Sequence, residues 1–332
     1  MPPPPLTTPP RPLDVPAHFP ELAPLARTTV RLHPRPGSPT AADSSLGGPL
    51  HWPAHEPWPT CSEHVGAPGL APDEVHHRRR ILAEARDRDR DRPRTPGTDF
   101  LTPEERAAVN RASEPRLIPQ PGPVPLLPVV QLYARDTPEA VALPGPPGTD
   151  LLQLLWCPFD HESPLGPTPR TELRWRTVTG VTAAAATTPR PQVIGKDRYL
   201  PEPCVLHPEA VTEYPAPHEL PEPLADRVEN WAESHGADYQ YDLAVAPGCK
   251  LGGHAPWSYI DPFPMACAQC GGPVQPLLTI DGYECDGGSR SWWPGEDTES
   301  ARPTHLNIGR DHALQLYVCT TSYDHPHQQH IQ

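Results

Sequence analysis

The residues of this chain best suited to chemistry are its cysteines and histidines, because several of them stand at the spacing of metal ligands. His64 follows Cys61 and Cys270 follows Cys267, with two residues between the members of each pair. Such a pair lets two ligands reach one metal ion from a tight turn, and a second pair from a distant strand completes a tetrahedron. Each half of the chain offers such a second pair. The candidate ligands are Cys61, His64, Cys157 and His161 in the first half, and Cys267, Cys270, Cys319 and His325 in the second.

The second candidate site has the stronger signal, because two glycines follow Cys270 directly, as in a zinc knuckle. Its fourth ligand is open, since both His325 and His327 follow Cys319. A closed site with four protein ligands predicts structural zinc and contributes ~10–16 kcal/mol of apparent binding free energy to folding. The alternative is that these residues are buried thiols at strand ends and exposed histidines. The other cysteines are interpreted as ordinary residues: Cys204, Cys249 and Cys285.

Both candidate sites lie within a pattern that occurs once in each half of the chain. A Leu-Gly-Gly triplet begins each copy, at residues 46–48 and 251–253, and a tryptophan follows four residues later. An aromatic residue between two prolines then precedes the first cysteine. A Leu-Gln-Leu sequence precedes the later cysteine, at 152–154 and 314–316. These matches, in the same order, predict an internal duplication; the alternative is chance similarity among Gly, Pro and Trp.

Apolar runs bounded by proline or glycine predict buried strands. Thr102, with Pro103 after it and Glu105 three residues on, predicts a capped helix N-terminus, and residues 224–234 favour a second helix. Because the chain contains 54 prolines, which disfavour helix interiors, long helices should be few. The prediction is a β-rich α+β fold with few short helices. The expected strands lie at residues 28–33, 129–133, 151–156 and 276–280.

Composition and the repeated pattern divide the chain into four parts. Residues 1–25 are expected to be a Pro-rich tail, and residues 26–180 the first repeat. This repeat contains an exposed, charged insertion at about 66–123, which includes alternating Arg and Asp residues from Arg86 onward. Residues 181–242 form a crossover with one helix, and residues 243–332 form the second repeat.

The charge balance favours protein partners over nucleic acid and membranes. The chain has 27 Lys and Arg against 41 Asp and Glu, a net charge of −14, which opposes binding to phosphate backbones and anionic lipids. Opposite charge would instead attract a basic partner, although acidity also serves solubility. No apolar run approaches the ~20 residues that cross a membrane, and residues 1–10 lack the features of a secretory signal. We therefore expect a cytoplasmic protein with reduced thiols.

No motif identifies a catalytic site. Asp281, Glu284 and Asp286 could act as acids or bases near the end of a predicted strand. Carboxylates beside glycines are also common in solvated loops. We therefore assign no catalytic residues.

The motifs resemble the YwqG-like bacterial family of unknown function, which is related to eukaryotic programmed cell death protein 2. The similarity covers about residues 26–161 and 243–325, with Cys61, Gln131-Leu132-Tyr133-Ala134 and Cys157 on the family pattern. His64 and His161 stand where the eukaryotic relatives have cysteines, and the zinc-binding insertion domain of some of those relatives is missing. The resemblance implies a tandem duplication of a YwqG-like repeat.

The resemblance also implies a function. The eukaryotic relatives are chaperones of a ribosomal protein with a basic surface, which implies a protein-binding or chaperone-like module for a basic client. Bacterial members occur near toxin systems, so an immunity or inhibitor protein is the alternative, followed by an enzyme of unknown reaction.

Overall fold

Two antiparallel six-stranded sheets contain most of the strands in the computed structural model. In the first sheet the strands follow the order β10 (Thr168–Arg176), β9 (Leu151–His161), β8 (Leu127–Tyr133), β3 (Ser45–Leu46), β11 (Cys204–Val205) and β2 (Arg35–Pro36). In the second sheet they follow the order β16 (Gln328–Ile331), β15 (Leu314–Cys319), β14 (Val274–Ile280), β13 (Lys250–Gly252), β1 (Arg27–Arg31) and β12 (Glu209–Glu213). The structure describes residues 7–89, 99–113, 118–139, 141–164, 166–181, 183–285, 288–294 and 302–332.

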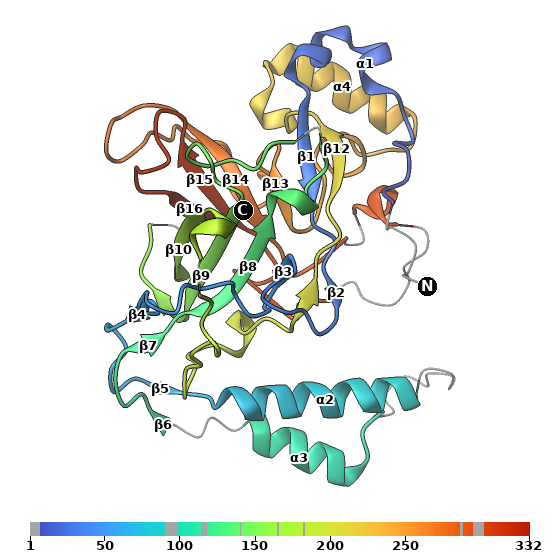
Figure 1. Ribbon diagram of the computed structural model, residues 1–332. Helices are drawn as coiled ribbons and strands as arrows, with labels where there is room; N and C mark the ends of the chain where they lie inside the picture. Colours follow the sequence, from blue (N-terminus) through green and yellow to red (C-terminus); the bar gives the residue numbers. More distant parts are fainter. Residues whose placement is uncertain are drawn as a thin grey trace.

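The predicted fold class is confirmed, since antiparallel strands predominate and the helices are few (Figure 1). The expected strands are present as β1, β8, β9 and β14. Two short two-stranded sheets complete the strand inventory of the described chain. They pair β4 (Thr60–Cys61) with β7 (Val124–Pro125), and β5 (Pro68–Gly69) with β6 (Ile118–Pro119).

Two chain segments pass from one sheet to the other. β1 belongs to the second sheet, whereas β2, which follows it at once, belongs to the first. β11 and β12 make the opposite passage, from the first sheet to the second. Hydrogen bonds continue across the bend, where Leu32 N–H donates to the Cys249 carbonyl at 2.9 Å and His207 N–H donates to the Leu32 carbonyl at 2.8 Å. The chain therefore crosses between the sheets twice, and four neighbouring strands follow the same order in each sheet, β3-β8-β9-β10 in the first and β13-β14-β15-β16 in the second. An internal duplication would produce this layout, and the duplication stays an interpretation of the sequence.

Matching irregularities also occur in the central hairpins of both sheets. The register between β8 and β9 shifts after Pro128, and the register between β14 and β15 shifts after Pro276. Proline has no amide hydrogen to donate to a ladder, so a bulge is the usual way to place it inside a sheet. The first glycine of each Leu-Gly-Gly triplet has a positive φ, +70° at Gly47 and +72° at Gly252.

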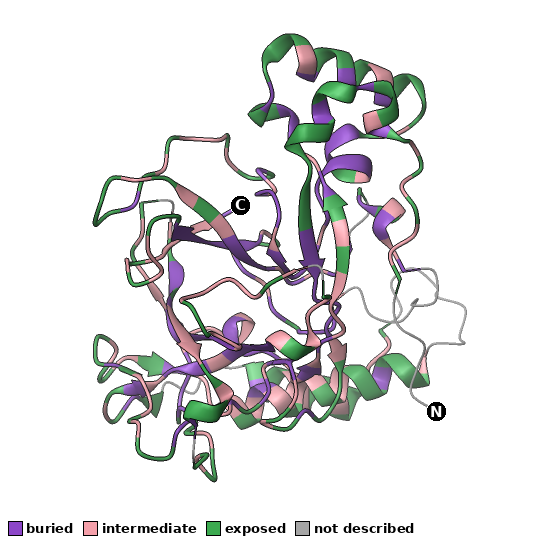
Figure 2. Cartoon of the chain, turned by 45° about the horizontal axis from the view of Figure 1, so that its top comes forward, coloured by how far each residue is buried: buried purple, intermediate pink, exposed green. Residues whose placement is uncertain are grey.

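The main apolar core lies between the sheets. From the first sheet, Leu152, Leu154 and Trp156 enter it, while Leu314 and Leu316 enter it from the second. Fully burying one such leucine contributes ~1.5–3 kcal/mol. β9 is buried on its other face as well, which explains its continuous apolar sequence. Figure 2 shows buried residues along the strands and exposed residues on the helices and outer loops.

The N-terminal region differs from the expected tail. Here α1 (Val15–His18) and the 3-10 helix η1 (Pro20–Leu25) pack on α4 (Glu222–Ser234), the helix expected in the crossover, at the end of the molecule beyond β1 and β12 (Figure 1). Val15, Phe19 and Leu22 are buried there. The segment is polar and Pro-rich on average, so its composition does not indicate these few apolar residues. Their burial orders the segment. The crossover segment is also part of the sheets, since it supplies β11 to the first sheet and β12 to the second.

The charged insertion folds as two antiparallel helices, α2 (Pro72–Arg88) and α3 (Pro103–Ser113), alongside the first sheet (Figure 1). The capped N-terminus of α3 is present as expected. Thr102 N–H donates to the Glu105 carboxylate at 2.9 Å, and Glu105 N–H donates to Thr102 Oγ1 at 3.2 Å. Part of the alternating Arg and Asp sequence, residues 90–92, lies outside the described residues.

Across the described part of the chain, no helix combines the length and apolar character needed to cross a membrane.

Candidate metal centres

The first cluster joins a short strand to a long one. Cys61 lies on β4, His64 lies in the turn after it, and Cys157 and His161 lie on β9. One ligand atom from each of these residues lies within 4.8 Å of the other three. The Cys61 Sγ and His161 Nε2 atoms are 3.8 Å apart, and the two histidine Nε2 atoms are 3.1 Å apart. The four ligand atoms thus surround one point.

Neighbouring side chains orient both histidines of the first cluster. The His64 ring stacks on Phe159, with ring centroids 4.5 Å apart and an interplanar angle of 13°. His161 Nδ1 lies 3.1 Å from the Glu63 carboxylate, which also pairs with Arg170. A carboxylate on the outer nitrogen of a ligating histidine fixes the ring and makes the inner nitrogen a better donor.

Burial controls protonation in the first cluster. Desolvation lowers the pKa of both His64 and His161, which favours the neutral imidazole that binds metal. Desolvation also raises the pKa of Cys157, to about 12. Without a metal ion this thiol therefore keeps its proton, and binding a metal would release it.

The second cluster joins a turn to the end of a strand. Cys267 and Cys270 stand in a tight turn closed by Gly271, whose φ is +69°. Cys319 is the last residue of β15, and His325 lies in the loop after it. His325 Nδ1 lies 3.4 Å from Cys267 Sγ and 3.3 Å from Cys319 Sγ, and the sulfurs of Cys270 and Cys319 are 3.6 Å apart.

Backbone amides point at the sulfurs of this second cluster. Gly272 N–H donates to Cys270 Sγ at 3.4 Å, and Thr321 N–H donates to Cys319 Sγ at 3.3 Å. Desolvation raises the pKa of Cys319, but backbone amides and His325 outweigh it and lower the pKa to about 6. The interaction with Cys319 in turn raises the pKa of His325. The surroundings of Cys319 therefore favour a thiolate, the form of cysteine that binds metal.

All eight predicted ligands fall into these two groups, and both groups could hold a metal ion. The open choice at the second site falls on His325, since His327 instead lies 2.7 Å from Thr171 Oγ1. The three cysteines expected to be ordinary are buried outside both groups: Cys204, Cys249 and Cys285.

Buried ion pairs cluster around β1 of the second sheet, near the bend in β1–β2, and the sequence did not indicate them. His33 has a φ of +41° and lies between the carboxylates of Glu209 and Glu284. Arg31 pairs with Glu284 at 3.0 Å, and Lys250 pairs with Glu213 in full burial. The only signal was the presence of Arg and His in an apolar strand.

These ion pairs change the interpretation of the carboxylates considered for catalysis. Glu284 is only 5 % exposed, and its carboxylate contacts Arg31 and His33. It is therefore held in a structural ion network and not in a solvated loop. Asp281 accepts a hydrogen bond from Tyr283 N–H at 2.9 Å, and Asp286 lies outside the described residues.

No protein-family model matches the chain, and no curated protein matches it either.

Proposed function

We propose that the chain is a protein-binding or chaperone-like module for a basic client, and that each of its two clusters holds a structural Zn²⁺ ion. The separations between ligand atoms carry the zinc proposal. In tetrahedral zinc with Zn–S near 2.3 Å and Zn–N near 2.0–2.1 Å, two sulfurs stand about 3.8 Å apart, a sulfur and a nitrogen about 3.6 Å, and two nitrogens about 3.3 Å.

The corresponding separations in both clusters are close to these values. They are 3.6 Å for Cys270 and Cys319, 3.3 to 3.8 Å between sulfur and nitrogen, and 3.1 Å for the two histidines. Thiolate and imidazole ligands in a tetrahedron favour zinc over magnesium or calcium, which prefer oxygen. Four protein ligands leave no open position for a substrate, so each ion would stabilise the fold and not catalyse a reaction.

The charge of α4 supports a basic client. Four carboxylates stand at helical spacing on its exposed face, and in the described structure none of them forms a salt bridge. The one arginine of the helix, Arg227, pairs with Glu21 at 3.1 Å. A helix face with this charge attracts a basic surface and repels an acidic one. The four residues are Glu222, Asp226, Glu229 and Glu233.

Metal analysis of the purified chain tests the zinc proposal. We expect two equivalents of zinc per chain and protection of the ligand thiols from modification. Zinc-free protein in which all eight thiols react at the rate of exposed cysteine would reject it.

Affinity purification with identification of bound proteins tests the binding proposal. We expect a basic partner that is lost when Asp226, Glu229 and Glu233 are changed together to Asn, Gln and Gln. The matched control changes three exposed carboxylates elsewhere, Asp73→Asn, Glu84→Gln and Glu104→Gln. Recovery of no specific partner, or equal loss of the partner in both triple variants, would argue against α4 as the client surface.

A further inference from the structure

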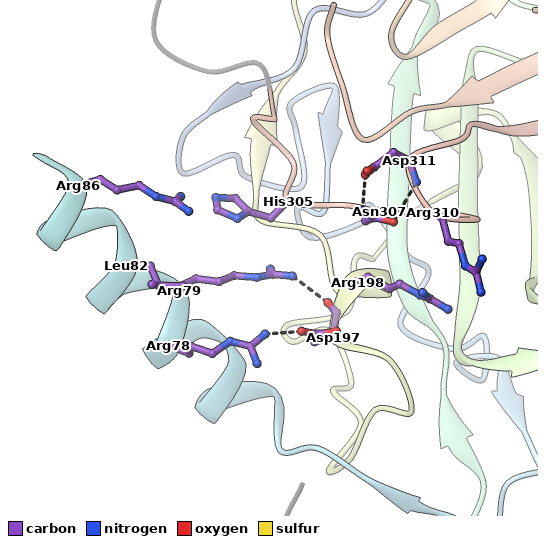
Figure 3. Close-up of a pocket in the computed structure, with 10 residues that line it drawn as sticks. All are labelled: Arg78, Arg79, Leu82, Arg86, Asp197, Arg198, His305, Asn307, Arg310 and Asp311. Carbon is purple, nitrogen blue, oxygen red and sulfur yellow. Dashed lines mark hydrogen bonds and ion pairs between the residues drawn. The ribbon is translucent and has the colours of Figure 1, made fainter. Parts of the chain in front are cut away.

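A cationic cavity of about 520 Å³ lies between α2 and two loops of the sheet region (Figure 3). Helix α2 forms one wall, and the loops around residues 197–198 and 305–311 form the other. Five arginines and one histidine line the cavity, compared with only two carboxylates, although the chain as a whole is strongly acidic. The cationic side chains are Arg78, Arg79, Arg86, Arg198, Arg310 and His305.

Both carboxylates of the cavity are already neutralised by their neighbours. Asp197 pairs with Arg78. Asp311 pairs with Arg302 at 2.8 Å and accepts a further hydrogen bond from the Asn307 amide. Their negative charge is therefore balanced by these partners. The remaining arginines give the cavity the positive charge that a ligand would encounter.

Arg79 fixes the α2 wall in place. Its guanidinium donates to the backbone carbonyls of Leu200 at 2.9 Å and Asp197 at 2.8 Å, and it pairs with Glu202 at 2.9 Å. Glu202 also contacts His76 on the same helix at 2.9 Å. The insertion expected to be an exposed appendage is thus attached to the body along the edge of this cavity.

Three arginines remain available to a ligand. Arg86, Arg198 and Arg310 form no ion pair within the described ranges of the chain. Arg198 Nε is moreover buried without a hydrogen-bond partner, which is costly unless a further group satisfies it. Arg86 and Arg310 are exposed at the rim. Figure 3 shows Arg86 pointing from α2 toward His305, while Arg198 and Arg310 start from the other wall and extend away from α2.

The loop that carries the second wall has unusual backbone geometry. His305, Arg310 and Asp311 adopt positive φ values of 53°, 66° and 73°. Such conformations are unfavourable for residues other than glycine, and they collect at ligand sites. Here they place His305 and Arg310 at the cavity.

We propose that this cavity binds a small polyphosphorylated molecule, that is, one carrying at least two phosphate groups. Arginine presents a planar fork that binds phosphate oxygens in pairs. The three available arginines come from α2 and from both loops, so one phosphate would leave part of the cationic lining unused. The site uses neither metal cluster and lies on a different element from α4, so it is independent of the function proposed above.

Calorimetric titration of the full chain tests the proposal, with tripolyphosphate, orthophosphate and citrate as probes. We expect saturable one-to-one binding of tripolyphosphate, with weaker binding of orthophosphate and of citrate. The variants Arg86→Gln and Arg198→Gln should each weaken tripolyphosphate binding about tenfold, the usual effect of losing one hydrogen-bonded charge. Arg80→Gln is the matched control, because it removes the same charge from α2 at an exposed position outside the cavity.

Unchanged circular dichroism would show that the variants fold, and neither of them removes a contact that attaches α2. Three results would overturn the proposal: no saturable binding, equal weakening by Arg80→Gln, or citrate binding at least as tightly as tripolyphosphate. The last result would assign the cavity to polycarboxylates. The zinc content of the same samples should stay constant, so this outcome is separate from that of the zinc proposal.

Discussion

The cysteines of the first cluster are part of an apolar core group, whereas the second cluster is exposed at one of its cysteines. Cys61 and Cys157 are both 0 % exposed and pack with Trp52 and Leu155 in one apolar group. In the second cluster, Cys267 and Cys319 are also buried, but Cys270 is exposed; the histidines of both clusters are half-buried. A metal ion in the first cluster would therefore hold core elements together, and one in the second would close two loops at the end of β15.

The two clusters also differ in donors. The first has two sulfurs and two nitrogens, and the second has three sulfurs and one nitrogen. A carboxylate supports a histidine of the first cluster, and backbone amides support the sulfurs of the second. Ligands at matching places in two similar sheets are thus stabilised by different means, because one site is buried in side chains and the other is formed by a turn.

The largest expected difference concerns folding. The double variant Cys61→Ala and Cys157→Ala should unfold the chain at 25 °C, because this site joins β4 to β9 within an apolar core group. Losing a structural zinc site there removes ~10–16 kcal/mol, against a total stability of ~5–15 kcal/mol. The corresponding variant, Cys267→Ala and Cys319→Ala, should keep both sheets and lose order mainly in its two loops. Circular dichroism with urea unfolding measures both.

A matched control for the lost thiols is Cys204→Ala, which removes a buried thiol outside both clusters. It should cost only a few kcal/mol at most, as other truncations in a core do. If both double variants unfolded alike, or if neither differed from this control, the contrast between a core site and a surface site would be wrong.

The next effect isolates the carboxylate of the first cluster. Glu63→Gln should lower the metal affinity of that cluster about 10–100-fold, the usual effect of losing the partner of a ligating histidine, and should leave the second cluster unchanged. Equilibrium competition with a chromophoric chelator measures both affinities. Glu162→Gln is the control, since Glu162 is an exposed neighbour of His161. An equal loss of metal affinity in the two variants would show that Glu63 does not support the site specifically.

A smaller effect is expected between the two unaltered clusters. Three thiolates donate more charge to zinc than two, so the second cluster should bind it more tightly, by about tenfold, or ~1.4 kcal/mol. Two-step competition, with each single-cluster variant used to assign the steps, would show the order. If the first cluster kept its metal longer at equilibrium, burial and not sulfur number would control affinity.

Sequence spacing predicted which cysteines and histidines come together, because each group is formed from local pairs. The turns at Cys61 and Cys267 each fix two ligands within four residues, and the apolar sequences that become β9 and β15 end at Cys157 or Cys319 or just beyond. The strands themselves followed from the same apolar runs. The choice of His325 over His327 required the loop to be placed in space.

Other features depended on contacts between distant residues. The passages of the chain between the sheets, from β1 to β2 and from β11 to β12, leave no local pattern, because the sequence of a strand does not show which sheet it joins. The buried position of His33 depends on Glu209 and Glu284, which are 176 and 251 residues away in the chain. The packing of Val15 and Phe19 on α4 likewise could not be predicted from the Pro-rich sequence around them.

The smallest effect comes from exchanging one ligand between the clusters. His64→Cys would give the first cluster the donor set of the second, and Cys270→His would do the reverse. His64→Cys should keep the metal and bring its affinity closer to that of the second cluster, while losing the stacking on Phe159, worth ~0.5–1.5 kcal/mol. The change in unfolding free energy should therefore be within about 1 kcal/mol of zero.

The same competition and urea measurements apply, with His55→Cys as a control for an added thiol, because His55 is exposed and outside the cluster. Loss of the metal from His64→Cys would mean that the turn at residue 64 is shaped for an imidazole, so that the donor sets of the two clusters could not be exchanged.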